Sequence, residues 1–206
     1  RGVTAEIGTN LTTGVLIGDV PFSDPYLPRV ALDPNPFDLA SVEVLKGPVG
    51  TLFGGSGLNG VIRYVPEAPK FGVAEVKYFA QYADYGSQGG AAPSYGAALN
   101  LPLGGQDLAL RVMAFKREAP GYVDDLQSGE QDVNSLDQSG YRAMLAWAPG
   151  ERWNFSLMHM AQESHVADYS FTDNQEGRLE RGDTPRPSPS DTSYDLTSLG
   201  IEYRFD

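Results

Sequence analysis

The side chains that could carry out chemistry in this chain are few. Its 206 residues include two histidines, His159 and His165, and no cysteine. Ser-His-Asp catalysis needs a histidine within reach of an activated serine, but His159 falls in a strand-like segment and His165 at the start of a polar loop. Without cysteine no thiolate metal site can form, and two histidines are too few for a histidine cluster. We therefore expect no catalytic residues, no metal site and no cofactor.

Carboxylates gather in two polar segments that could offer hard oxygen ligands to Ca²⁺. The first holds Asp124, Asp125, Glu130, Asp132 and Asp137, and the second holds Asp168, Asp173, Glu176, Glu180 and Asp183. Neither has the Asp-x-Asp-x-Asp-Gly spacing of a calcium loop. We therefore favour solvated loop surfaces and leave calcium binding open.

The most informative stretch runs from Ser41 to Pro69. It reads as two short strands, residues 42–46 and 60–65, separated by the Gly47-Pro48 turn and a glycine cluster. Proline fixes its own φ, and glycine accepts conformations that are closed to other residues. The cluster, formed by Gly54, Gly55, Gly57 and Gly60, therefore requires positive φ or the close approach of another backbone.

The whole string, Val-Glu-Val-Leu-Lys-Gly-Pro-x-Gly-Thr-Leu-Phe-Gly followed by Gly-Val-Ile-Arg-Tyr and a proline, resembles the end of the plug domain of TonB-dependent outer-membrane receptors. The motif residues are Lys46, Gly47, Pro48, Gly50, Gly54, Gly60 and Arg63. The family usually has arginine where this chain has Lys46, and often glycine where it has Asn59. The resemblance extends through Arg1-Gly-Val and Gly14-Val-Leu-Ile-Gly-Asp-Val-Pro, a run whose apolar part is also compatible with a buried strand.

The resemblance implies that residues 1–70 are the latter part of a plug, with a proline-rich loop across 20–37 that faces an external ligand. Four side chains of this loop, Phe22, Tyr26, Arg29 and Asp33, are the candidate ligand-binding residues. Aromatic faces and a guanidinium suit an aromatic or chelate-type ligand. The alternative is that these side chains pack the plug against a barrel wall.

From Phe71 onward, apolar residues alternate with polar or small ones, which is the period of a strand with one apolar face. The alternating segments cover residues 74–84, 95–103, 108–115, 141–147, 153–158 and 198–205. The connections at 102–106 and 148–152 are short, whereas those at 85–94, 118–139 and 164–192 are long and polar. Short periplasmic turns that alternate with long external loops are typical of an outer-membrane barrel.

Aromatic and charged residues fit the same interpretation. Tyr85, Tyr95, Trp147 and Trp153 fall near strand ends, where an aromatic girdle would lie at the headgroup level. The alternative is that they cap a soluble sheet. Arg111 and Arg142 alternate with the apolar residues, so we expect both to point inward and to pair with carboxylates.

Six strands cannot close around a plug, and open sheet edges are not tolerated in lipid. We therefore expect residues 71–206 to be the first six strands, arranged as three antiparallel hairpins, of a larger barrel. The resemblance implies 22 strands in the whole receptor. The predicted fold class is all-β with small α content, a fragment of a plugged transmembrane β-barrel.

The function implied by the resemblance is energised uptake of a scarce ligand, most often a ferric siderophore, by an outer-membrane receptor of a Gram-negative bacterium. The implied partners are the external small ligand, membrane lipid, and a TonB-type energy-transducing protein bound through an N-terminal segment missing from this chain. The net charge of −12 argues against nucleic acid as a partner. The sequence contains no run of 18 apolar residues, so it predicts no membrane helix. The alternative function is a soluble or secreted all-β binding module that uses its long acidic loops. An enzyme is not expected.

Overall fold

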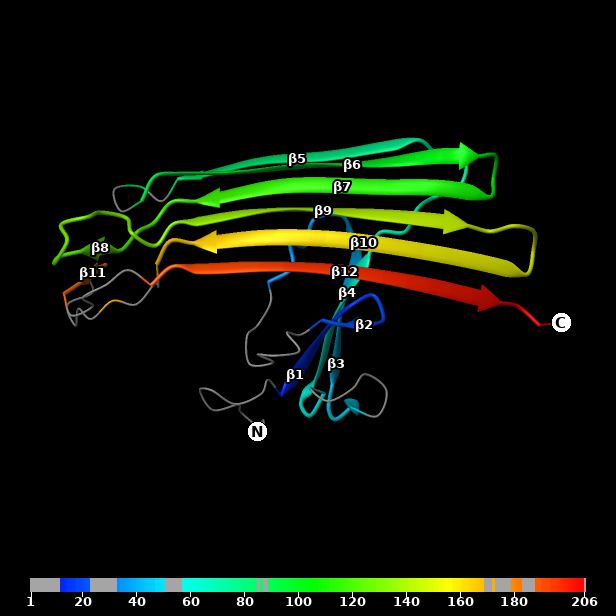
Figure 1. The fold of residues 1–206 in the computed structure, drawn as a ribbon, viewed down its shortest axis with the longest axis horizontal. Helices are drawn as coiled ribbons and strands as arrows, with labels where there is room; N and C mark the ends of the chain where they lie inside the picture. Colours follow the sequence, from blue (N-terminus) through cyan, green and yellow to red (C-terminus); the bar gives the residue numbers. More distant parts are fainter. Residues whose placement is uncertain are drawn as a thin grey trace. The chain divides into compact units, whose positions relative to one another are not determined.

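In the computed structural model, the structure describes residues 12–22, 33–50, 57–84, 86, 89–168, 172, 179–182 and 188–205. The elements defined in these ranges are all β-strands (Figure 1), so the all-β fold class is confirmed. In the same ranges, no helix has the length and apolar character needed to cross a membrane. The chain divides into two compact units, Arg1–Ala68 and Pro69–Asp206. Their assignment as plug and barrel strands is taken up below as a proposal.

The first unit is a four-stranded sheet with the order β2-β1-β4-β3. Its strands are β1 (Thr13–Ile17), β2 (Val20–Pro21), β3 (Leu39–Lys46) and β4 (Gly60–Pro66). β4 pairs in parallel with β1 and antiparallel with β3. The buried side chains Leu16, Ile17 and Val61 come from β1 and β4. The apolar run after Gly14 and the two strands of the glycine-rich stretch therefore meet in one sheet.

The second unit is a six-stranded antiparallel sheet with the order β12-β10-β9-β7-β6-β5 (Figure 1). Its strands are β5 (Glu75–Asp84), β6 (Ala91–Gly104), β7 (Leu108–Ala119), β9 (Leu136–Trp147), β10 (Trp153–Val166) and β12 (Ser190–Tyr203). Each strand pairs with the one before it in this sheet, and the short connections fall at 105–107 and 148–152. The predicted three hairpins, with their alternating short and long connections, are present.

The strands extend further into the long connections than alternation predicts. β6 begins at Ala91, β9 at Leu136 and β12 at Ser190, whereas alternation placed all three starts later. At these ends most residues are polar or small, with few large apolar side chains such as Leu136 and Leu196, so the period-2 signal weakens although the backbone ladder continues. Two further short strands, β8 (Asp124–Asp125) and β11 (Glu180–Arg181), pair in parallel within the long connections and were not anticipated.

One face of the six-stranded sheet is apolar and exposed, and we call it the exposed face. A row of leucines crosses five adjacent strands in direct register: Leu101, Leu110, Leu145, Leu157 and Leu199. Leu199 is 68% exposed, and Val76 and Tyr78 on β5 are also exposed. Toward the long connections this face becomes charged, with Lys116, Glu118, Asp137, Glu163, His165 and Asp191.

The opposite face of the same sheet, the buried face, carries a row in which phenylalanine and glycine alternate. Phe79, Gly96, Phe115 and Gly140 stand in direct register across β5, β6, β7 and β9. A Cβ at Gly96 would lie 2.6 Å from the Phe79 ring and 2.9 Å from the carbonyl oxygen of Ala114. The rings therefore occupy the space that the glycines leave open, an arrangement that shields the glycine backbone.

Candidate functional site

Glycine at two positions shapes the motif hairpin of β3 and β4. Gly60 has φ +133°, and a Cβ there would overlap the carbonyl oxygen of Leu45 on the paired strand. Gly47 has φ +96°, and its amide donates to the carbonyl oxygen of Asn59 at 3.0 Å. Both motif glycines are thus required by backbone geometry: Gly47 by its positive φ in the predicted turn, and Gly60 of the glycine cluster by positive φ and the close approach of another backbone.

Arg63 on β4 bonds to three other residues of the first unit. Its Nη2 lies 2.6 Å from Asp19 Oδ1, its Nη1 lies 3.0 Å from Glu43 Oε2, and its Nε donates to the carbonyl oxygen of Gly18 at 2.8 Å. The hydrogen bond to Glu43, with the nearby Asp19, raises the pKa of the guanidinium above its ordinary value. The planar fork thereby joins the β1–β2 turn to β3.

The remaining motif positions differ in what the structure says of them. Lys46 is exposed at the end of β3, and Pro48 and Gly50 follow in the turn. Asn59 donates from Nδ2 to Thr12 Oγ1 at 2.9 Å. Gly54 lies outside the described residues. The assignment of these residues to a plug motif stays a prediction.

Of the four candidate ligand residues of the proline-rich loop, the structure describes two, Phe22 and Asp33. Phe22 is buried, with 6% of its surface exposed, and its amide donates to the carbonyl oxygen of Val15 at 2.7 Å. Asp33 is exposed. Tyr26 and Arg29 lie outside the described residues. Ligand binding by these four side chains therefore stays a prediction.

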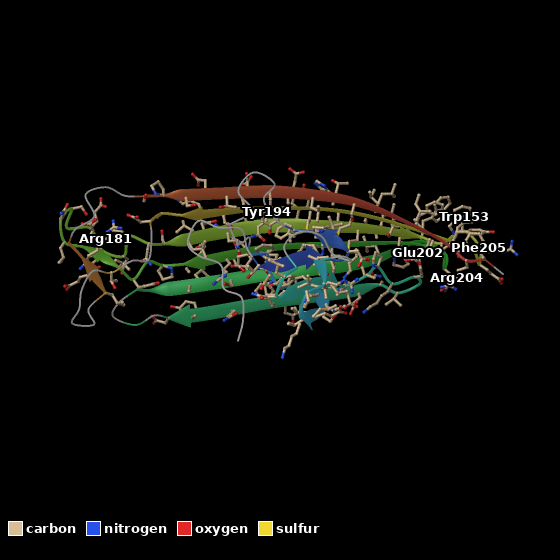
Figure 2. All side chains as sticks on the ribbon, turned by 90° about the horizontal axis from the view of Figure 1, so that it is seen from below. Trp153, Arg181, Tyr194, Glu202, Arg204 and Phe205 are labelled. Atoms are coloured by element: carbon tan, nitrogen blue, oxygen red, sulfur yellow. The ribbon has the colours of Figure 1, made fainter. Side chains whose placement is uncertain are left out.

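A buried ion cluster joins the connection between β7 and β9 to the connection between β10 and β12. Arg181 on β11 places Nη2 at 2.8 Å from Asp125 Oδ2 and at 2.5 Å from Asp168 Oδ2. All three side chains are nearly inaccessible, with Asp168 only 1% exposed. Figure 2 shows Arg181 at the opposite end of the sheet from Trp153 and Phe205. We call residues 120–135 and 167–189, where they are described, the loop lobe.

Backbone amides complete the cluster. Asp125 Oδ1 accepts from the amides of Gln127 and Ser128, and Asp168 Oδ1 accepts from the amide of Ser188 at 3.0 Å. The Ser128 hydrogen bond, together with the Arg181 guanidinium, lowers the pKa of the Asp125 carboxyl. Two carboxylates in turn raise the pKa of Arg181, with Asp168 as the larger cause. The Asp125 carboxylate and the Arg181 guanidinium are therefore charged at neutral pH.

The loop lobe corrects one expectation from the sequence. Asp125 and Asp168 were assigned to solvated loop surfaces, but both are buried because Arg181 and backbone amides replace their water. The sequence analysis did not single out Arg181. The same segment also contains Arg178 and Arg186, and the sequence gives no reason to prefer one of the three arginines. Arg178 and Arg186 lie outside the described residues. Across the described ranges, no group of three histidine, aspartate or glutamate side chains could hold a metal ion.

At the other end of the sheet, aromatic side chains form a continuous cluster on the exposed face. Trp147 stacks on Phe155 at 5.2 Å between ring centroids, Trp153 lies 5.7 Å from Phe155 and 4.7 Å from Tyr203, and Tyr203 contacts Phe205. The cluster includes two of the four predicted girdle residues. Of the other two, Tyr85 lies outside the described residues, and Tyr95 lies within β6 near the charged end of the exposed face.

The two arginines expected to point inward do so. Arg111 is 2% exposed on the buried face, and its Nη1 lies 3.2 Å from Glu75 Oε2. Arg142 is buried on the same face. Placement on the face opposite the leucine row follows from strand alternation, as the sequence predicts.

The fold is that of ferric siderophore receptors of known structure. No family model matches the chain. The ferric yersiniabactin uptake receptor FyuA from Yersinia pestis superimposes with a TM-score of 0.75 at 19% identity over 95% of this chain and 30% of that one. The ferric-catecholate import receptor Fiu from E. coli K12 gives 0.72 at 16% identity over 97% of this chain and 30% of that one. The ferripyoverdine receptor of the outer membrane of Pseudomonas aeruginosa gives 0.70 at 15% identity over 96% of this chain and 26% of that one.

These comparisons define the class of this protein by its fold. The chain has the fold found in TonB-dependent outer-membrane receptors, in agreement with the resemblance of its glycine-rich stretch. It spans less than a third of the length of the receptors compared.

Proposed function

We propose that this chain is part of a TonB-dependent outer-membrane receptor that takes up a ferric siderophore. Residues 1–70 are the latter part of its plug, and residues 71–206 contribute its first six barrel strands. The receptor resides in the outer membrane of a Gram-negative bacterium, and uptake is driven by a TonB-type energy-transducing protein. It binds and transports its ligand without changing it chemically.

The exposed face of the six-stranded sheet is the observation that carries this proposal. On β10 this face carries Trp153, Phe155, Leu157 and Ala161, with His159 among them hydrogen-bonded to Tyr141 and Thr197, and Glu163 and His165 follow beyond Ala161. From Trp153 to Ala161 the strand rises by eight steps of about 3.3 Å, which cover about 20 Å along a membrane normal when the strand is tilted by about 40°. This height is close to the apolar band of about 25 Å on transmembrane barrels. Contiguous apolar surface of this extent is uncommon on soluble proteins.

The arrangement of the two sheet ends supports one orientation. The short connections lie beside the aromatic cluster, and the long connections form the loop lobe at the other end (Figures 1 and 2). Outer-membrane barrels have short turns on the periplasmic side and long loops outside. In this orientation the loop lobe faces the medium. The candidate ligand-binding residues remain Phe22, Tyr26, Arg29 and Asp33 of the proline-rich loop.

The solved receptors with this fold are described as receptors for ferric yersiniabactin, ferripyoverdine and ferric catecholates. We therefore propose a ferric chelate as the ligand class. The competing function, a soluble binding module with acidic loops, leaves the leucine row without a partner.

The test uses the full-length product of the gene that encodes these residues. A deletion strain grown under iron limitation is supplied with single ferric chelates, and uptake of radiolabelled iron is measured. We expect loss of uptake for at least one chelate, recovery on complementation, and abolition by a protonophore. Normal uptake of every ferric chelate, with loss of cobalamin, haem or glycan uptake, would overturn the ligand class. A gene product that stays in the aqueous phase without detergent would overturn the receptor itself.

A further inference from the structure

The segment that follows the first unit is hydrogen-bonded to the six-stranded sheet through one buried asparagine side chain. We call residues 69–74 the strap. Asn100 on β6 is 0% exposed, and its Oδ1 accepts from the amide of Lys70 at 2.9 Å. Its Nδ2 donates to the carbonyl oxygens of Lys70 at 2.8 Å and Val73 at 2.7 Å. Both Nδ2 hydrogens and the side-chain oxygen of Asn100 are thus used to bind strap backbone.

Ion pairs also bind the strap to the sheet at this place. Glu75, Asn100 and Arg111 stand in direct register on β5, β6 and β7. Glu75 Oε2 lies 3.1 Å from Lys70 Nζ and 3.2 Å from Arg111 Nη1. Lys70 is therefore bound through its amide, its carbonyl and its side chain. Arg111, which is buried, links this group to the third strand of the sheet.

A third contact lies at the turn of the strap. Gly72 has φ +68°, and a Cβ there would lie 2.9 Å from the side-chain amide of Gln106. Gln106 belongs to the short 105–107 connection between β6 and β7. The strap therefore contacts a connection of the sheet as well as its strands.

The contacts within the first unit are of a different kind. Arg63 joins β1, β3 and β4 through ion pairs in which Asp19 is 83% exposed and Glu43 is 45% exposed. Exposed ion pairs contribute little and open easily, whereas buried hydrogen-bonded groups open only with the element that holds them. The Arg63 ion pairs of the first unit are therefore expected to open more easily than the hydrogen bonds of buried Asn100.

We propose that the strap is a fixed anchor, so that any rearrangement of the plug during uptake ends at Lys70 and leaves residues 70–74 bound to Asn100. This proposal rests on the proposed receptor function. Its first experiment does not depend on uptake, so the two can fail separately. The anchor keeps β5 paired in the sheet while the residues before it move.

The first experiment is hydrogen–deuterium exchange on the full-length protein in detergent. Replacing Asn100 by leucine removes all three hydrogen bonds, so we expect amides of the strap to exchange at least about tenfold faster than in the wild type. Strands β5, β6 and β7 are expected to keep their protection. The matched control is Asn154→Leu, at an exposed asparagine of β10 in the same sheet, which is expected to leave strap exchange unchanged.

The second experiment cross-links the strap in an otherwise native protein. The chain contains no cysteine, so Gly72→Cys with Gln106→Cys introduces the only thiols in these residues. A fixed anchor predicts equal iron uptake by the oxidised and reduced forms of this variant, and the comparison cancels the strain of a side chain at Gly72. Gln106→Cys alone is the control for oxidation.

Two results would overturn the anchor. The first is unchanged strap exchange in Asn100→Leu, or equal acceleration in the strap and the strands, because either result denies a specific role to Asn100. The second is uptake that stops on oxidation and returns on reduction, because the strap must then leave the sheet during transport. If the wild type takes up no ferric chelate, the proposed function fails while the exchange experiment still tests the anchor.

Discussion

At the scale of single residues, Arg181 organises the loop lobe. It is the cation of a buried group with two carboxylates, so its removal leaves negative charge uncompensated in a site closed to water. Buried groups of this kind contribute little net stability compared with apolar packing, but they are costly to break on one side. The loop lobe is therefore ordered by one side chain from each of three places in the sequence.

Arg181→Met is expected to open the loop lobe. Removal of one partner of a buried ion pair costs about 3–5 kcal/mol, and here the loss appears as local unfolding. Hydrogen exchange in residues 120–135 should accelerate while the six long strands stay protected. Arg204→Met, at an exposed arginine after β12, is the control. Equal protection of the lobe in both variants would contradict the assignment.

The same cluster predicts a dependence on acid. The pKa of Asp125 is lower in the folded lobe than its ordinary value because Ser128 and Arg181 stabilise the carboxylate. The contribution of Asp125 to the stability of the loop lobe is therefore complete above the ordinary carboxyl range near pH 4. It is lost as the pH falls toward the pKa of Asp125 in the folded lobe. The rate of amide hydrogen exchange in the loop lobe, corrected for the intrinsic exchange rates, should be constant from pH 7 to about 4 and should rise at lower pH.

Asp125→Asn provides the comparison for this pH dependence. The variant has no carboxylate at this position to protonate, so its lobe should be less protected at neutral pH and change less on acidification. Glu130→Gln, at an exposed carboxylate of the same lobe, should follow the wild type. A wild-type lobe whose protection is unaffected down to pH 2 would show that Asp125 does not carry the effect.

At the scale of elements, register across the sheet decides which glycines are essential. Gly96 and Gly140 alternate with Phe79 and Phe115 in one row, so each ring covers a neighbouring glycine. Gly104, on the same strand as Gly96, has no such neighbour, and a Cβ there would meet Leu108 Cβ at an ordinary 3.5 Å. Identical residues on one strand thus have different roles.

Gly96→Ala should destabilise the sheet, and Gly104→Ala should not. The new Cβ at Gly96 meets the Phe79 ring and the Ala114 carbonyl, and overpacking of this kind costs about 1–3 kcal/mol. The free energy of unfolding in urea, measured on the full-length protein refolded into lipid vesicles, is the observable. If both variants unfold alike, the Phe–Gly row has no packing role.

At the scale of the whole molecule, the exposed face separates the membrane receptor from a soluble module. Leu157 lies in the leucine row, between Leu145 and Leu199. A lysine at mid-bilayer on the lipid side of a barrel costs about 2–4 kcal/mol. The same change on a surface in water is usually within about 0.5 kcal/mol.

Leu157→Lys is therefore expected to lower the stability of the full-length protein in lipid vesicles by about 2–4 kcal/mol. Ser193→Lys is the control, because Ser193 is exposed on β12 near the charged end of the same face. Equal stability of the two variants would favour the soluble module. The measurement is the urea midpoint of unfolding at constant lipid concentration.

The sequence determined the features that depend on near neighbours in the chain. Alternation from Phe71 onward predicted the six strands and their exposed face, and Gly47 and Gly60 marked backbone conformations that the hairpin requires. Arg111 and Arg142 were placed on the buried face by the same alternation. These predictions succeed because strand period and turn geometry are local properties.

The tertiary structure alone decided which distant residues meet. Arg181 pairs with Asp168, 13 residues away, and Asp125, 56 residues away, and two other arginines in its segment gave no reason to prefer it. Asn100 reads in the sequence as an ordinary polar strand residue, yet it binds the strap 30 residues earlier. Strand register and loop pairing place these groups together, and neither follows from local sequence. The physical reason is that burial and partner choice are set by the folded sheet, not by the residues next in the chain.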